Sequence, residues 1–294
     1  MRRLTLVAIF AALFFAAIAS AQTSAPIAPV ITTDPAASAR PALPIPLQPN
    51  LPTIFLVGDS TVRNGKGDGA GGQWGWGEPL VHFFDLARVN VTNRALGGRS
   101  SRTYITDGRW EETLAYVKTG DIVIIQFGHN DDGPLDDTAR ARGTLPGTGP
   151  ETREIDNPLT HQHEVVHTYG WYLRQYVDQA RKKGATPILC SPIPRKTWKG
   201  DHIARNVESY GGWARQVAEE EKIGFLNLNE LIARCYDLLG PEKVEAMFAD
   251  PHTHTSLAGA ELNAQVVISA LKALPKNPVA QYFDAQAKAV PPAQ

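Results

Sequence analysis

The stretch that decides the fold is Thr-Ile-Phe-Leu-Val-Gly-Asp-Ser-Thr, residues 53–61. Its first half is a short, apolar, β-branched run, which is typical of a buried strand in a parallel sheet. The run breaks at Gly58, and Asp59 and Ser60 follow it. Because ligands of open α/β sheets bind beyond the carboxyl ends of the strands, Ser60 lies where a nucleophile is expected. Taken alone, the segment Gly-Asp-Ser-Thr, residues 58–61, is equally typical of an ordinary turn or a helix N-cap.

Strand-like and helix-like stretches alternate along the chain after residue 52. Strands are expected at residues 53–58, 89–93, 121–127, 185–190 and 224–228. Helices are expected at residues 77–87, 111–116, 163–183, 206–222, 229–239 and 257–274. This alternation predicts an α/β domain, in which a central parallel sheet of about five strands is covered by helices on both faces.

The length and charge of the chain restrict its class. It has 294 residues, 43% of them hydrophobic, and a formal net charge of −1. This is enough for one sizeable α/β domain, which we assign to residues 52–294. The near-neutral charge gives no basic footprint, so nucleic acid is not an expected partner.

The first residues have the pattern of a secretory signal peptide, which we assign to residues 1–21. Arg2 and Arg3 provide the positive charge, a short apolar run follows, and Ala-Ser-Ala forms the cleavage site. The alternative is a membrane anchor, for which the run is short. A secreted or periplasmic protein without stable membrane insertion is expected. Residues 22–51 are rich in Pro, Ala, Ser and Thr and indicate a mobile linker.

Two further strand ends carry groups that can donate hydrogen bonds. Gly98 follows the second expected strand and has no side chain to keep a ligand from its backbone N–H. Asn130 follows the third and carries an amide. Its alternative role is to satisfy a turn. Since parallel strands end at one edge of the sheet, we expect both groups near Ser60.

The loop before the last expected helix contains Asp250 and His254. Acyl transfer needs a hydroxyl, a base that activates it and a carboxylate that orients the base. Ser60, His254 and Asp250 are the candidates for these catalytic roles. An oxyanion hole is also needed, and its candidate donors are the N–H groups of Ser60 and Gly98 and the amide of Asn130.

Residues 133–157 form a long insertion rich in Gly, Pro and Thr, which we expect to form part of the wall of a substrate groove. His161, His163 and His167 follow it. No His-Glu-x-x-His pattern is present and the run is expected to open an amphipathic helix, so no metal site is predicted.

Two features leave alternatives open. Trp74 and Trp76 lie in a glycine-rich stretch, either as packed aromatics or as a rim that stacks on sugar rings. Cys190 and Cys235 are either a disulfide of an exported protein or two buried thiols.

The ordered motifs resemble those of the SGNH (GDSL-type) hydrolases. They are Gly58-Asp59-Ser60, Gly98, Gly128-His129-Asn130-Asp131 and the final His with its nearby acid. Within this family, residues 58–62, 95–102, 166–171 and 252–256 most resemble the rhamnogalacturonan acetylesterases. The resemblance covers about residues 52–274. It implies a three-layer α/β/α, flavodoxin-like fold, removal of acetyl groups from pectic rhamnogalacturonan, and no metal or organic cofactor.

The resemblance assigns the nucleophile, the base, its acid and two oxyanion donors to Ser60, His254, Asp250, Gly98 and Asn130. One position departs from the family. The acid usually stands three residues before the histidine, where this chain has Pro251, and Asp250 is one residue further back. Either the loop absorbs the shift, or His254 uses another acceptor. A third arrangement has His252 as the base.

These observations predict an exported serine esterase that deacetylates rhamnogalacturonan through an acetyl-serine intermediate. One alternative is a related hydrolase acting on acetylated xylan, small aryl esters or lysophospholipids. The other alternative is a non-catalytic carbohydrate-binding relative, and the displacement of Asp250 is the one feature that favours it.

Overall fold

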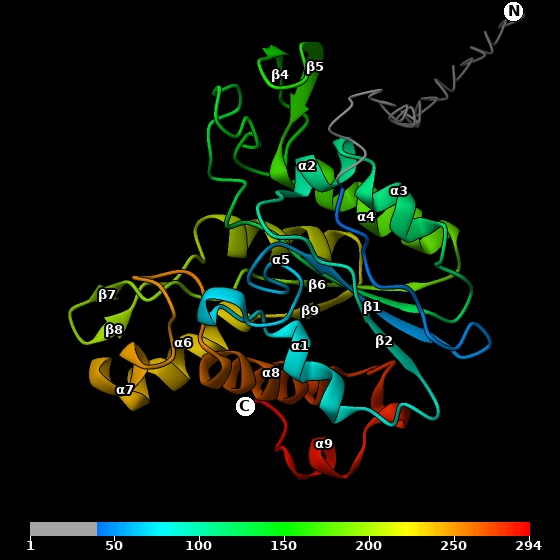
Figure 1. The fold of residues 1–294 in the computed structure, drawn as a ribbon, viewed down its shortest axis with the longest axis vertical. Helices are drawn as coiled ribbons and strands as arrows, with labels where there is room; N and C mark the ends of the chain where they lie inside the picture. Colours follow the sequence, from blue (N-terminus) through cyan, green and yellow to red (C-terminus); the bar gives the residue numbers. More distant parts are fainter. Residues whose placement is uncertain (1–39) are drawn as a thin grey trace, which may run out of the picture.

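The computed structural model of the protein describes residues 40–294, so the predicted signal peptide lies outside the described residues. A parallel sheet runs through the domain in the strand order β2-β1-β3-β6-β9 (Figure 1). Its strands are β1 Thr53–Gly58, β2 Asn90–Asn93, β3 Ile122–Gln126, β6 Thr186–Cys190 and β9 Gly224–Leu226. This order is that of a flavodoxin-like sheet, in which the crevice beside the first strand is the ligand site. The predicted fold class is confirmed.

Helices cover both faces because successive side chains of a strand point to opposite sides. Ile54 and Leu56 belong to a core shared with α1, α6 and α8. Phe55 and Val57 belong to a second core shared with α2, α3, α4 and α5. Figure 1 shows these two helical layers on either side of the sheet. The helices are α1 Gly77–Leu80, α2 Ser101–Thr106, α3 Arg109–Leu114, α4 Tyr169–Lys182, α5 Tyr210–Glu220, α6 Leu228–Leu239, α7 Pro241–Glu245, α8 Leu257–Ala273 and α9 Ala285–Ala289.

The segment expected to open a helix at residue 163 is a strand instead. Strand β5, Gln162–His167, pairs with β4, Thr152–Asn157, in an antiparallel hairpin that projects from the domain (Figure 1). Helix α4 begins only at Tyr169, because the Thr168 hydroxyl caps it by accepting a hydrogen bond from the Trp171 N–H. The predicted helix began too early because the short strand β5 directly precedes α4, and its few residues were read as part of the helical pattern.

The described part of the predicted linker, residues 40–51, packs against the domain. Leu43 is buried in the second core. Arg94 donates a hydrogen bond to the Pro44 carbonyl, and Asn90 and Gln48 exchange two more. These contacts hold residues 43–48 against the domain, which composition alone does not reveal.

Cys190 and Cys235 are free thiols. Cys190 is buried at the end of β6, and burial raises the pKa of its thiol. Within residues 40–294, no helix combines the length and the apolar character that crossing a bilayer requires.

The insertion is attached to the domain through the buried guanidinium of Arg102, on α2. Arg102 forms two hydrogen bonds with the Glu164 carboxylate, at 2.7 and 2.9 Å. It also donates to three backbone carbonyls of the insertion, those of Leu135, Ala141 and Gly143. One side chain of the sheet domain thereby holds the loop and the hairpin together.

We expect Arg102→Ala to destabilise the fold by about 3–5 kcal/mol, because it leaves a part-buried carboxylate and buried carbonyls without a donor. Denaturant unfolding followed by circular dichroism measures the change. The matched control is Arg153→Ala, which removes an exposed ion pair with Asp136 in the same insertion and is expected to cost less than about 1 kcal/mol. Equal effects of the two variants would contradict a structural role for Arg102.

Candidate active site

Ser60 lies in the turn after β1 and is almost fully buried. The Asp59 carboxylate fixes this turn by accepting hydrogen bonds from the N–H and the hydroxyl of Thr61, at 2.8 and 2.7 Å. The Thr61 hydroxyl accepts from Gln126 Nε2, and Gln126 Oε1 accepts from the Trp76 indole. Since Gln126 ends β3 and Trp76 is in the core, the turn is tied to the sheet below Ser60.

The loop between α7 and α8 brings His254 and Asp250 to the same edge. His254 Nε2 lies 2.9 Å from Ser60 Oγ, and His254 Nδ1 lies 2.5 Å from Asp250 Oδ2. Thr255 anchors this loop to Trp74 through two hydrogen bonds, at 2.9 and 2.8 Å. A hydroxyl, an imidazole and a carboxylate thus form one hydrogen-bonded chain.

The backbone of its own loop keeps Asp250 ionised. Asp250 Oδ1 accepts hydrogen bonds from the N–H groups of His252, Thr253 and His254. Partial burial opposes the charge, but these donors and the imidazole lower the pKa of Asp250 to about 2. A carboxylate at Nδ1 favours the tautomer with the proton on Nδ1, which leaves Nε2 as a proton acceptor for Ser60.

The loop absorbs the one-residue shift of the acid. The turn closed by Asp250 Oδ1 brings its second oxygen to His254, four residues later. His252 takes a different course, because its Nδ1 contacts the Thr253 hydroxyl, and the imidazole that reaches Ser60 is that of His254. The third arrangement, with His252 as the base, is therefore wrong.

Gly98 lies in the loop after β2, which runs beside the Ser60 turn. The Leu96 N–H donates to the Gly58 carbonyl at 3.0 Å and fixes the two segments relative to each other. Gly98 has a φ of 78°, in the left-handed region that favours glycine. Its N–H has no acceptor within residues 40–294, so it can donate to a ligand.

Asn130 follows β3, and its Nδ2 donates to the Arg99 carbonyl at 2.8 Å. This bond uses one of two amide hydrogens, orients the side chain and leaves the second hydrogen for a ligand. The Ser60 N–H likewise has no acceptor in the described part of the chain. The three predicted donors therefore come from three strand ends of one sheet edge.

The same order of motifs defines a known family. The sequence model of the GDSL-like lipase/acylhydrolase family matches residues 56–262. The chain belongs to this family. Together with the esterases among its relatives, this placement makes the protein a carboxylic ester hydrolase. The resemblance found in the sequence is confirmed.

Curated relatives and solved structures agree with this placement. The rhamnogalacturonan acetylesterase of Emericella nidulans is 30% identical over 220 residues, 74% of this chain and 84% of the relative. The probable rhamnogalacturonan acetylesterase YesY of Bacillus subtilis is 32% identical over 226 residues, 75% and 93% of the two chains. The crystal structure of YxiM from Bacillus subtilis superposes with a TM-score of 0.61 at 29% identity, covering 76% of this chain and 56% of that one.

Asp131 is a buried residue next to the site to which the sequence alone assigned no role. It is fully buried beside Asn130, and its Oδ1 accepts hydrogen bonds from the N–H and the hydroxyl of Ser101. Burial raises the pKa of Asp131 to about 7, against the effect of the Ser101 donors. Because Ser101 begins α2 three residues after Gly98, Asp131 joins the segments that carry Gly98 and Asn130. Its place in the Gly-His-Asn-Asp motif was the available signal.

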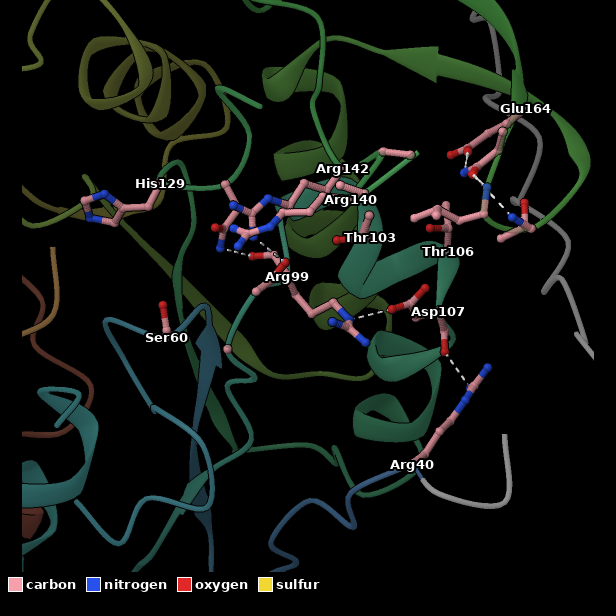
Figure 2. A pocket seen from close by; sticks show the side chains of 18 of the residues that line it. Arg40, Ser60, Arg99, Thr103, Thr106, Asp107, His129, Arg140, Arg142 and Glu164 are labelled. Atoms are coloured by element: carbon pink, nitrogen blue, oxygen red, sulfur yellow. Dashed lines mark hydrogen bonds and ion pairs between the residues drawn. The ribbon is translucent and has the colours of Figure 1, made fainter. Parts of the chain in front are cut away.

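Ser60 and His254 line an open cavity of about 1210 Å³. Residues 139–142, 157 and 159–164 line it as well, so the insertion and the hairpin form part of its wall, as predicted for residues 133–157. Figure 2 shows side chains from both sides of this cavity. Its lining includes five arginines, Arg40, Arg99, Arg140, Arg142 and Arg195.

The two tryptophans do not form a sugar-binding rim. Trp76 is fully buried in the core, and the Trp74 ring lies against Gly69; neither lines the cavity. His161 and His163 do line it. Among residues 40–294, no group of three or more His, Cys, Asp or Glu side chains is arranged to hold a metal ion.

Proposed function

We propose that the protein is an exported serine esterase that removes acetyl groups from pectic rhamnogalacturonan. The observation that carries this proposal is the hydrogen-bonded chain of Ser60, His254 and Asp250 beside unused N–H donors. Export is supported by the signal-peptide pattern of residues 1–21.

The first half of the reaction forms an acetyl-serine. Ser60 Oγ attacks the acetyl carbonyl while His254 Nε2 takes its proton. The negative charge on the carbonyl oxygen is stabilised by the N–H groups of Ser60 and Gly98 and by the free amide hydrogen of Asn130. Asp250 stabilises the imidazolium that forms. His254 then protonates the sugar oxygen, which leaves as the C–O bond to the acetyl carbon breaks.

The second half releases acetate. Water enters in place of the sugar, and His254 Nε2 removes its proton as the water attacks the acetyl carbonyl. The same donors stabilise the second oxyanion. Ser60 leaves and regains its proton from His254, so the protein returns to its starting state and neither a metal nor an organic cofactor is used.

The size and lining of the cavity favour a sugar chain over a lipid. A volume of about 1210 Å³ exceeds what an acetyl group needs and is enough for several sugar units. Apart from glycines and two alanines, its lining residues other than Leu159 are polar or charged, and such a lining suits a hydrated sugar chain better than a long acyl chain. The two named rhamnogalacturonan acetylesterases among the relatives support the pectic substrate.

Acetate release tests the proposal directly. We expect kcat/KM on acetylated rhamnogalacturonan to exceed that on acetylated xylan by about tenfold or more, and long-chain esters to be inert. Preference for xylan would reassign the substrate. Binding of polysaccharide without release of acetate from any ester would favour the non-catalytic alternative.

A further inference from the structure

The cavity concentrates positive charge that the chain as a whole lacks. The protein has 29 Lys and Arg against 30 Asp and Glu. The cavity lining, in contrast, contains five arginines and two acids, Asp107 and Glu164. A lining with such an excess of positive charge raises the local concentration of negatively charged ligands.

Both acids of the cavity already have arginine partners. Glu164 accepts two hydrogen bonds from the buried Arg102, and the Asp107 carboxylate lies 2.5 Å from Arg99 Nε. Asp107 therefore leaves the outer nitrogens of Arg99 available. Neither acid forms an ion pair with Arg140 or Arg142 within residues 40–294.

Arg140 and Arg142 hold most of their donors unused. The Arg140 side chain is exposed and makes no hydrogen bond or ion pair in the described part of the chain. Arg142 donates only Nη1, to the Gly98 carbonyl at 3.1 Å, and its buried Nε has no protein acceptor. Asp137, the nearest acid along the chain, accepts through Oδ1 from the N–H groups of Arg140 and Ala141.

The two guanidinium groups also repel each other. Partial burial, followed by the charge of Arg140, lowers the pKa of Arg142. Figure 2 shows Arg140 and Arg142 close together, while Arg99, which lines the same cavity, extends toward Asp107. The charges of Asp59, Asp131 and Asp137 offset this repulsion in part, and an anion bound between the two guanidinium groups would stabilise them further.

We infer that Arg99, Arg140 and Arg142 form a subsite for the carboxylate of a uronic acid in the sugar chain that carries the acetyl group. This inference rests on the proposed function. The planar guanidinium fork matches a carboxylate and can bind it through two parallel hydrogen bonds. Because Arg142 contacts the Gly98 carbonyl, the subsite lies beside the proposed oxyanion donors and positions a uronate close to the reacting ester.

Binding without turnover gives the test. Calorimetry with the Ser60→Ala protein measures Kd for oligogalacturonate and for xylo-oligosaccharide of equal length. Adding Arg140→Gln to this protein is expected to raise Kd for oligogalacturonate about tenfold relative to Kd for xylo-oligosaccharide. Arg140→Lys keeps the charge and is expected largely to restore the original ratio of the two Kd values. Because the exposed Arg140 side chain makes no hydrogen bond or ion pair within residues 40–294, its variants are expected to fold. The control is Arg153→Gln, which removes the same charge from the insertion outside the cavity lining and is expected to change Kd less than about twofold.

The outcomes separate the two proposals. An equal change of Kd for both oligosaccharides, or no change for oligogalacturonate, would overturn the subsite even if the wild type deacetylates rhamnogalacturonan. Conversely, Arg140-dependent binding of oligogalacturonate by a wild-type protein that releases no acetate would support the subsite and refute the esterase.

Discussion

Replacing Ser60 with alanine is expected to lower kcat for acetate release by about 10⁴-fold or more. The hydroxyl whose oxygen lies 2.9 Å from His254 Nε2 is the only group of the hydrogen-bonded chain that can form the acyl intermediate. His254→Ala is expected to cost a similar factor, and the double variant little more, because the two residues act as one unit. The small remaining rate would come from the oxyanion donors.

Initial rates on acetylated rhamnogalacturonan and on 4-nitrophenyl acetate measure this loss. Ser209→Ala, at the start of α5, is a suitable control, since its hydroxyl makes a single hydrogen bond within residues 40–294, to the Asn206 carbonyl. That variant is expected to retain the wild-type rate within about twofold. Acetate release by Ser60→Ala above a hundredth of the wild-type rate would place the nucleophile elsewhere.

Asp250→Asn is expected to lower kcat by about 10²–10⁴-fold while the fold persists. The asparagine oxygen can still accept the loop N–H groups at the position of Oδ1. Its amide nitrogen then faces His254 Nδ1, and an N–H donor there favours the tautomer with the proton on Nε2. Nε2 in that state cannot accept the proton of Ser60.

The pH dependence distinguishes this role from a titrating base. Asp250 has a pKa of about 2, below the ordinary 3.8, so its stabilising contribution is present above pH 4 and is lost as the pH falls through 2. The acid limb of kcat/KM in the wild type therefore should not come from Asp250. Asp284→Asn is the matched control, since Asp284 caps α9 far along the chain from the site. If Asp250→Asn kept more than a tenth of the wild-type kcat, His254 would have another acceptor.

The sequence by itself determined the sheet and most of the catalytic edge. The uninterrupted apolar run of Ile54, Phe55, Leu56 and Val57 is typical of a strand buried on both faces, and its side chains do alternate between the two cores. Parallel strands have their carboxyl ends at one edge, so residues that follow those strands meet there. This rule alone places Ser60 near the segments of Gly98 and Asn130.

Only the tertiary structure decided which more distant groups complete the site. Asp250 is the acid because three N–H groups of its own turn fix the carboxylate, and the direction of an N–H is not encoded in residue spacing. Arg102 and Glu164 are 62 residues apart, yet they pair, and Arg102 also holds the Ala141 carbonyl, next to Arg140 in the cavity wall. Contacts of this kind depend on chain segments that no local pattern relates. The same packing decided that Trp76 belongs to the core and that Leu43, within residues 40–51, is buried against the domain.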